Sequence, residues 1–179
     1  MKNSKKTLQR LCINAILIAL VVVFDILAVK LPNIKITFGG LPIIICAIIY
    51  GPLDGAVVGL CGSFIGQLFT YGLSITTPLW IIPAGARGIV MGLLFIAFKR
   101  IKAFPVLTLE IIISSIVVTA LNTLATYLDG IIIGYDVRIV FVTTVIRFVI
   151  GIITAVIYSA LTTVIIRATN HYSSKTTSA

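Results

Sequence analysis

Long apolar runs follow one another along the chain, separated by short segments rich in glycine, proline or charged residues. A helix that crosses a membrane needs about 20 apolar residues. On this basis we predict six spans, at about residues 11–30, 37–51, 54–73, 78–98, 106–128 and 139–166. The second run, of about fifteen residues, is the shortest and could re-enter the membrane instead of crossing it. The pattern predicts an all-α integral membrane protein with six transmembrane helices.

Basic residues indicate how these spans are oriented. If the N-terminus is cytoplasmic and all six segments cross, nine of the fourteen Lys and Arg residues lie on the cytoplasmic side, three lie outside and two lie within spans. If the second segment did not cross, the basic cluster KRIK at residues 99–102 would lie outside, against the positive-inside rule. We therefore predict cytoplasmic N- and C-termini and a single membrane domain over residues 1–179.

Composition supports a location in the cell membrane. Hydrophobic residues make up 59% and charged residues 11% of the chain, whereas a soluble domain has about 25% charged residues. The net charge of +9 comes mainly from residues that flank the spans, so we predict the lipid bilayer, and not a nucleic acid, as partner. The first apolar run continues past Asp25 to Val29 without a small-residue cleavage site, which predicts a retained helix instead of a signal peptide.

Sequence motifs for catalysis and nucleotide hydrolysis are absent. The chain has no GxxxxGK(S/T), HExxH or GxSxG motif, and its one histidine, His171, follows the last apolar run. Cys12, Cys46 and Cys61 lie in apolar runs without a CxxC pair, which predicts buried free thiols and no metal site. We therefore predict no enzyme activity, no catalytic residue and no cofactor.

Polar residues inside the apolar runs are the candidates for function, because a charged side chain in lipid must face protein, water or a partner. At 1.5 Å per residue, Arg87 lies about 13 Å into the fourth span and Arg147 at a similar depth in the sixth. Polar side chains of three other spans reach the same outer half, namely Asp25, Ser63, Gln67, Asn122 and Thr126. The sequence predicts one polar layer that binds an anionic ligand, since guanidinium suits carboxylate or phosphate.

Several polar and aromatic residues have alternative interpretations. The polar layer could instead hold helices together, with an ion pair between Asp25 and an arginine. Trp80, near the start of the fourth span, could be an interfacial aromatic residue or could stack on a planar ligand. Glu110, near the cytoplasmic end of the fifth span, is predicted to extend to the membrane surface or to pair with Lys102.

Glycines recur on one face of the third span, at positions 55, 59, 62 and 66, and again in the fourth span at positions 88 and 92. Small residues at this spacing let two helices approach closely in lipid. We predict that these glycine faces allow close helix packing inside the bundle.

Two stretches resemble a known family. They are AILIA in the first span, at residues 15–19, and ITFGGLPIIICAIIYGPLDGAVVGLCGSFIGQL at residues 36–68. Both are similar to the substrate-binding S components of energy-coupling factor (ECF) vitamin transporters. The pattern FGxLP, then GPxxG, then a glycine-rich helix is most similar to the folate-type branch.

This resemblance implies an uptake system with further subunits. In the family, the S component captures a vitamin and works with one transmembrane coupling subunit and two cytoplasmic ATPase subunits. The small-residue motif of the first helix contacts the coupling subunit, which implies that role for Ala15 and Ala19. Folate or a related vitamin is the first expectation, with pantothenate, pyridoxine and a pyrimidine precursor of thiamine as alternatives. A structural or assembly protein and a stand-alone permease are the competing classes.

Depth and residue type suggest roles for the polar residues, and the resemblance implies that Trp80, Arg87, Asn122 and Arg147 lie in the ligand region. Arg87 and Arg147 would bind anionic or carbonyl groups of the ligand, and Asp25 would orient an arginine or accept a ring N–H. Asn122 and Gln67 would supply hydrogen bonds, and Trp80 would stack on the ligand. A lid over the site would hinge at three residues of the first outer loop, Gly39, Gly40 and Pro42.

Overall fold

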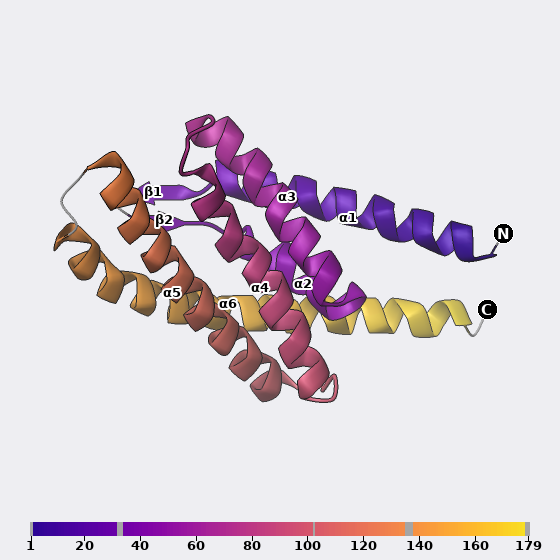
Figure 1. The fold of residues 1–179 in the computed structure, drawn as a ribbon. Coiled ribbons are helices and arrows are strands. Elements are labelled where there is room, and N and C mark those ends of the chain that lie inside the picture. The colour runs from indigo at the N-terminus through magenta and orange to yellow at the C-terminus, as the bar shows by residue number, and fades with distance from the viewer. Residues whose placement is uncertain (1, 32–33, 102, 135–137, 178–179) are drawn as a thin grey trace.

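Six helices and one pair of short strands make up the computed structural model (Figure 1). It describes the backbone of residues 2–31, 34–101, 103–134 and 138–177, and side chains over residues 5–28, 37–101, 103–134 and 144–166. In chain order the elements are α1 (Lys2–Ile26), β1 (Val29–Leu31), β2 (Ile34–Ile36), α2 (Gly40–Tyr50), α3 (Pro52–Tyr71), α4 (Thr77–Ala97), α5 (Phe104–Ile133) and α6 (Arg138–Thr177).

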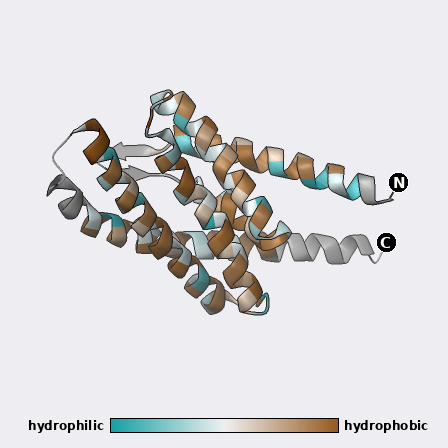
Figure 2. Ribbon diagram, viewed as in Figure 1, coloured by the Kyte–Doolittle hydropathy of each residue, from teal (hydrophilic) through white to brown (hydrophobic). Residues whose placement is uncertain are grey.

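Five of these helices, α1, α3, α4, α5 and α6, are long and apolar enough to cross a membrane over the residues described. Figure 2 shows apolar residues along their length. The sixth helix, α2, corresponds to the predicted segment 37–51 and has only 11 residues. At 1.5 Å per residue it is about 16 Å long, well short of the roughly 30 Å hydrocarbon core.

The short helix α2 is surrounded by protein, and eight of its residues are buried. It contacts α1, α3, α4 and α6, so most of the helix is shielded from lipid and need not match the bilayer thickness. Together with the β1–β2 segment it returns the chain to the side on which α1 begins. Both ends of the chain therefore lie on the same side of the bundle (Figure 1), as the predicted topology requires.

The first connection between long helices contains an antiparallel hairpin that was not predicted. Val29 pairs with Ile36 and Leu31 pairs with Ile34. The sequence does carry a hairpin signal there, because VKL and IKI alternate apolar and basic residues on either side of a Pro-Asn pair. The hairpin leads into Thr37 and the buried start of α2.

The glycine faces of α3 and α4 pack against each other, which confirms the predicted close approach. A Cβ atom added to Gly88 would overlap the backbone of Gly55, and one added to Gly59 would overlap the carbonyl of Ala84. Alanine at either position would force the two helices apart. This contact fixes α4, and with it Arg87, against the buried core around α2.

Candidate functional site

Arg87 of α4 lies in the centre of the bundle, between α2 and α6. Its guanidinium carbon is 5.8 Å from the centroid of the Tyr158 ring, close enough for a cation–π contact. A Cβ atom added to Gly40 would be 3.2 Å from this carbon and 2.9 Å from Cε2 of Tyr158. Glycine at position 40 therefore leaves the space that the two side chains occupy.

One donor of this guanidinium is unused. Nη1 of Arg87 is buried and has no hydrogen-bond partner among the residues that the structure describes. The alternative of an ion pair with Asp25 is not found for this arginine. A buried cation with an open donor is costly unless an acceptor fills the position, so Arg87 has the property expected of a residue that binds an anionic ligand group.

Asp25 at the end of α1 is buried and, unlike Nη1 of Arg87, has a hydrogen-bond partner. Its Oδ1 accepts a hydrogen bond from Oγ1 of Thr37 at 2.8 Å. Cβ atoms added to Gly39 and Gly66 would each lie 3.0 Å from a carboxylate oxygen of Asp25. The two glycines thus admit the carboxylate between α2 and α3, and Asp25 anchors the end of α1.

Thr37 joins three parts of the structure that are distant in sequence. Its Oγ1 lies 2.8 Å from Asp25 Oδ1 and 3.0 Å from the carbonyl oxygen of Phe24, and accepts the N–H of Gly39 at 3.0 Å. Its carbonyl accepts the hydroxyl of Tyr158 at 2.6 Å. Thr37 therefore links the end of α1 and the start of α2 to the tyrosine that packs on Arg87.

Thr37 and Tyr158 were missed by the sequence analysis. Tyr158 lies within the long apolar run of α6, where it reads as one more large apolar residue. A signal was available, since a tyrosine in the middle of a span must place its hydroxyl on a partner. Thr37 gave no comparable signal, because its importance comes from contacts across 121 residues of sequence.

Arg147 lies in a different place from Arg87. Its Nη1 donates to Oγ1 of Thr126, and that hydroxyl donates to the carbonyl of Asn122 at 2.8 Å. Tyr158, which marks the level of Arg87, is eleven residues further along α6, a separation of about 16 Å. The two arginines therefore have separate contacts, and the prediction that they share one polar layer stays a prediction.

The other predicted ligand residues are spread along the outer half. The carbonyl of Trp80 accepts a long hydrogen bond of 3.5 Å from Ser63, and the tryptophan is half-buried. Gln67 on α3 and Asn122 on α5 are also half-buried. No hydrogen bond among the described residues joins these three side chains to Arg87. The structure brings Gly40 to Arg87 and Gly39 to Asp25, and the roles of Trp80, Gln67 and Asn122 stay predictions.

The predicted hinge residues, Gly39, Gly40 and Pro42, are all buried at the start of α2. Gly39 has a helical backbone with φ of −57°, which any residue can adopt. These glycines therefore provide space for Asp25, Arg87 and Tyr158, and their use as a hinge stays a prediction.

Two predictions about burial are corrected. Glu110 is fully buried and does not extend to the membrane surface, and neither of its carboxylate oxygens has a hydrogen-bond partner in the described part of the chain. Its other predicted partner, Lys102, lies outside the described residues. The cysteines are free, but Cys12 and Cys61 are exposed on the helix surfaces and only Cys46 is buried.

The two alanines of the first helix are exposed, as a contact site for another subunit requires. Ala15 and Ala19 lie on the open side of α1, whereas Asn14, Leu17 and Val21 are buried. The exposed side is apolar and small at these two positions, so it suits close helix packing.

Comparison with known proteins identifies the family. The family model described as "ECF transporter, substrate-specific component" matches residues 9–166. The chain is also similar to a solved S component of a bacterial ECF transporter, with a TM-score of 0.69 and 21% sequence identity over 93% of this chain and 98% of that chain. No curated protein gives a significant match.

These findings define the family and the fold but not the folate-type branch. The family model covers most of the chain, and the structural similarity extends over almost all of both chains. The protein is a multi-pass membrane protein whose family implies an ECF transporter complex with membrane and ATPase subunits. The chain belongs to the family of substrate-specific components of ECF transporters.

Proposed function

We propose that this chain is the substrate-binding membrane subunit of an ECF-type ABC transporter that imports a vitamin, with folate or a related compound as the first substrate to test. The observation that carries this proposal is Arg87, a buried cation with an open Nη1. A substrate carboxylate would supply the missing acceptor. Guanidinium binds carboxylate through two parallel hydrogen bonds, which gives both affinity and orientation.

The surroundings of Arg87 support a planar or aromatic ligand next to the acidic group. The Tyr158 ring already lies beside the guanidinium, and Phe38 is 6.3 Å from that ring between centroids. Phe38 is exposed at the outer end of the bundle, near the hairpin. We propose that a ligand enters past Phe38 and that the β1–β2 hairpin with the start of α2 closes over it.

Arg147 distinguishes long ligands from short ones. It lies about 16 Å along α6 from the Tyr158 level, so only an elongated ligand such as folate can contact both arginines. A compact ligand such as pyridoxine would reach Arg87 alone. We propose that Trp80, Gln67 and Asn122 line the space between the two levels, with Trp80 stacking and the amides donating hydrogen bonds.

The energy for transport would come from other subunits. We propose that Ala15 and Ala19 contact the transmembrane coupling subunit, which joins the chain to two cytoplasmic ATPase subunits. In this orientation the N- and C-terminal ends of the chain, which lie on one side of the bundle, face the cytoplasm. Replacing Ala19 by tryptophan should prevent this association and leave ligand binding intact, because the position is exposed and remote from Arg87.

The proposal is tested by a binding assay with a defined panel. Purified protein in detergent is titrated with folate, pantothenate, pyridoxine and the hydroxymethyl pyrimidine of thiamine, and native mass spectrometry detects any ligand retained from the host. We expect one compound to bind and to lose binding in Arg87→Met. Absence of binding across the panel and an empty native spectrum would favour a structural or assembly role instead.

The matched control is Arg147→Met. If the ligand is compact, this variant should bind like the wild type, and if the ligand is elongated its affinity should fall as well. Equal affinity of wild type and Arg87→Met for the retained compound would exclude Arg87 as the anion site.

A further inference from the structure

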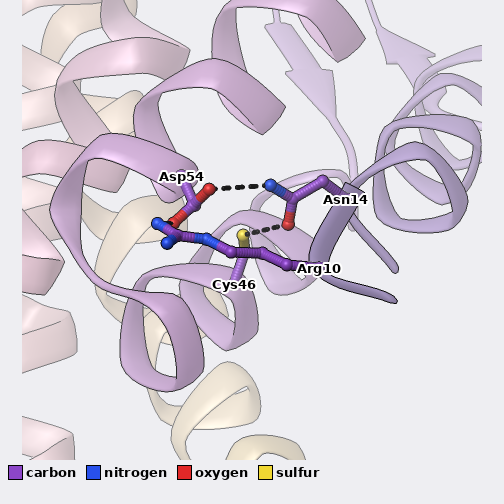
Figure 3. A network of polar contacts seen from close by, with 4 residues as sticks. All are labelled: Arg10, Asn14, Cys46 and Asp54. Carbon is purple, nitrogen blue, oxygen red and sulfur yellow. Dashed lines mark hydrogen bonds and ion pairs between the residues drawn. The ribbon is translucent and has the colours of Figure 1, made fainter. Parts of the chain in front are cut away.

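A carboxylate at the opposite end of the bundle holds α1 through two side chains. Figure 3 shows Asp54, in the first turn of α3, between Arg10 and Asn14 of α1. Arg10 forms an ion pair with Oδ2 of Asp54, and Nδ2 of Asn14 donates to Oδ1 at 2.8 Å. Each oxygen of this carboxylate therefore binds a different residue of the same helix.

Two further contacts extend this network to α2. The thiol of Cys46 lies 3.5 Å from Oδ1 of Asn14, to which it donates, and the Arg10 guanidinium carbon is 6.0 Å from the centroid of the Tyr50 ring. Asn14 is buried, so its amide is held by both α2 and α3. We call Arg10, Asn14 and Asp54 the Asp54 clamp.

The clamp determines the rotation of α1 about its own axis. Arg10 and Asn14 are four residues apart, so they lie on the same side of the helix. A rotation or a one-residue slip of α1 would move one of them away from the carboxylate. Apolar contacts fix the rotation less well than these polar contacts, because in a bilayer apolar side chains pack against lipid nearly as favourably as against a helix.

Helix α1 depends on polar contacts for its position more than the other helices do. Only 17% of its apolar span is buried, against 33–39% in the four other long helices. Its inward residues below the outer end are mostly aliphatic, namely Leu17 and Val21. Asp25 anchors the outer end, and the Asp54 clamp is the corresponding polar contact at the other end.

The exposed alanines lie beside the clamp. Ala15 follows Asn14 and is rotated by about 100° from it around the helix. When Asn14 is held against α2 and α3, Ala15 and Ala19 are therefore held on the open side of α1. We propose that Asp54 is a positioning residue, which holds α1 in the rotation that presents Ala15 and Ala19 to the coupling subunit. The partner in this statement rests on the proposed function.

The orientation of α1 is measured first, without ligand or partner. Nitroxide labels are attached to cysteines introduced at two exposed positions, Ala19 on α1 and Leu93 on α4, with Cys12 and Cys61 replaced by serine and the buried Cys46 kept. Double electron–electron resonance should give one narrow distance distribution, and Asp54→Ala should broaden or shift it. An unchanged distribution in Asp54→Ala would overturn the proposal.

The matched control is Asp129→Asn, which changes a buried acid of α5, a helix other than the two that the Asp54 clamp joins. It should leave the distribution narrow. Asp54→Ala is expected to fold, because an ion pair with a half-exposed arginine contributes little to stability. If it does not fold, Arg10→Gln and Asn14→Leu remove the two contacts separately, and the proposal requires each to broaden the distribution.

Association with the purified coupling subunit and ATPases is the second readout. We expect Asp54→Ala to weaken association about tenfold while the affinity for the vitamin identified by the panel stays unchanged, and Asp54→Glu to restore part of the association. If wild type fails to associate, the proposed function is wrong, whereas the resonance result still decides the role of the clamp. Wild-type association in an Asp54→Ala protein with a broadened distribution would overturn the link to docking.

Discussion

Arg10 and Arg87 are the same side chain in two opposite situations. Arg10, at the end of the bundle where the chain begins, is 49% exposed and paired with Asp54, which also accepts a hydrogen bond from Asn14. Arg87 is enclosed by α2 and α6, contacts the face of Tyr158 and keeps a buried Nη1 without a partner in the described structure. The more exposed arginine is thus the better satisfied of the two.

This difference separates a structural role from a binding role. A charge that the protein itself satisfies holds elements together, as Asp54 holds α1. A buried charge that the protein leaves open is destabilising in the empty protein, and for Arg87 we propose that a ligand completes it. The comparison makes ligand binding sensitive to Arg87 and insensitive to Arg10.

The largest expected effect is therefore the loss of ligand affinity when Arg87 is replaced. Arg87→Met keeps much of the side-chain volume and removes the charge, so the affinity for an acidic ligand should fall about 100-fold or more, as for the loss of a charge-assisted hydrogen-bond pair. Isothermal titration with the compound identified by the panel measures this. Arg10→Met should change the affinity less than about threefold, and a similar loss in both variants would contradict the comparison.

Gly40 tests whether the space around Arg87 matters as much as its charge. In Gly40→Ala the new Cβ would lie 2.9 Å from Tyr158 Cε2 and 3.2 Å from the Arg87 guanidinium carbon, so both groups must move. We expect the ligand affinity to fall about tenfold, measured in the same titration. Gly151→Ala is the control, because its Cβ would meet only a threonine hydroxyl at 3.1 Å. Wild-type affinity in Gly40→Ala would show that the space at position 40 does not limit ligand binding.

Glu110 tests whether every open buried charge is a binding site, and we expect that it is not one. It is fully buried among apolar residues of α5 and its oxygens lack partners in the residues described. Glu110→Leu should raise the melting temperature of the empty protein by about 2–4 °C, which corresponds to about 1 kcal/mol, with little change in ligand affinity. A lower melting temperature would mean that Glu110 has a partner in the native protein.

The sequence was sufficient for the long helices and for close packing at the glycine faces, but not for which helices these faces bring together. Apolar length identifies a span because lipid imposes its thickness on any helix that it surrounds. That reasoning fails for α2, since a helix enclosed by protein is free of this constraint. The hairpin before α2 was also missed, although its alternating residues predict it.

The site was harder to predict because depth was counted along each helix separately. Arg87 and Arg147 are at similar distances from the starts of α4 and α6, yet Arg147 lies about 16 Å along α6 from the tyrosine that contacts Arg87. The reason is visible in Figure 1, where the outer ends of α5 and α6 reach further than the start of α4. Residue type pointed to Asp25, which is buried, and to Arg87, whose Nη1 is buried. Their neighbours Thr37 and Tyr158 depended on how the helices are offset.

The smallest expected effect concerns the hydrogen bond that ties this site to the first outer loop. Tyr158→Phe keeps the ring beside Arg87 and removes only the hydroxyl that donates to Thr37 at 2.6 Å. A neutral hydrogen bond contributes about 1 kcal/mol, so the affinity should fall about three- to fivefold, with a faster dissociation rate if the loop closes over the ligand. Stopped-flow measurement of association and dissociation separates these terms. Thr37→Ala keeps the carbonyl that accepts this bond but loses the contact with Asp25. A larger loss of affinity in Thr37→Ala than in Tyr158→Phe would mean that the loop is held mainly by its contact with α1 and not by its contact with α6.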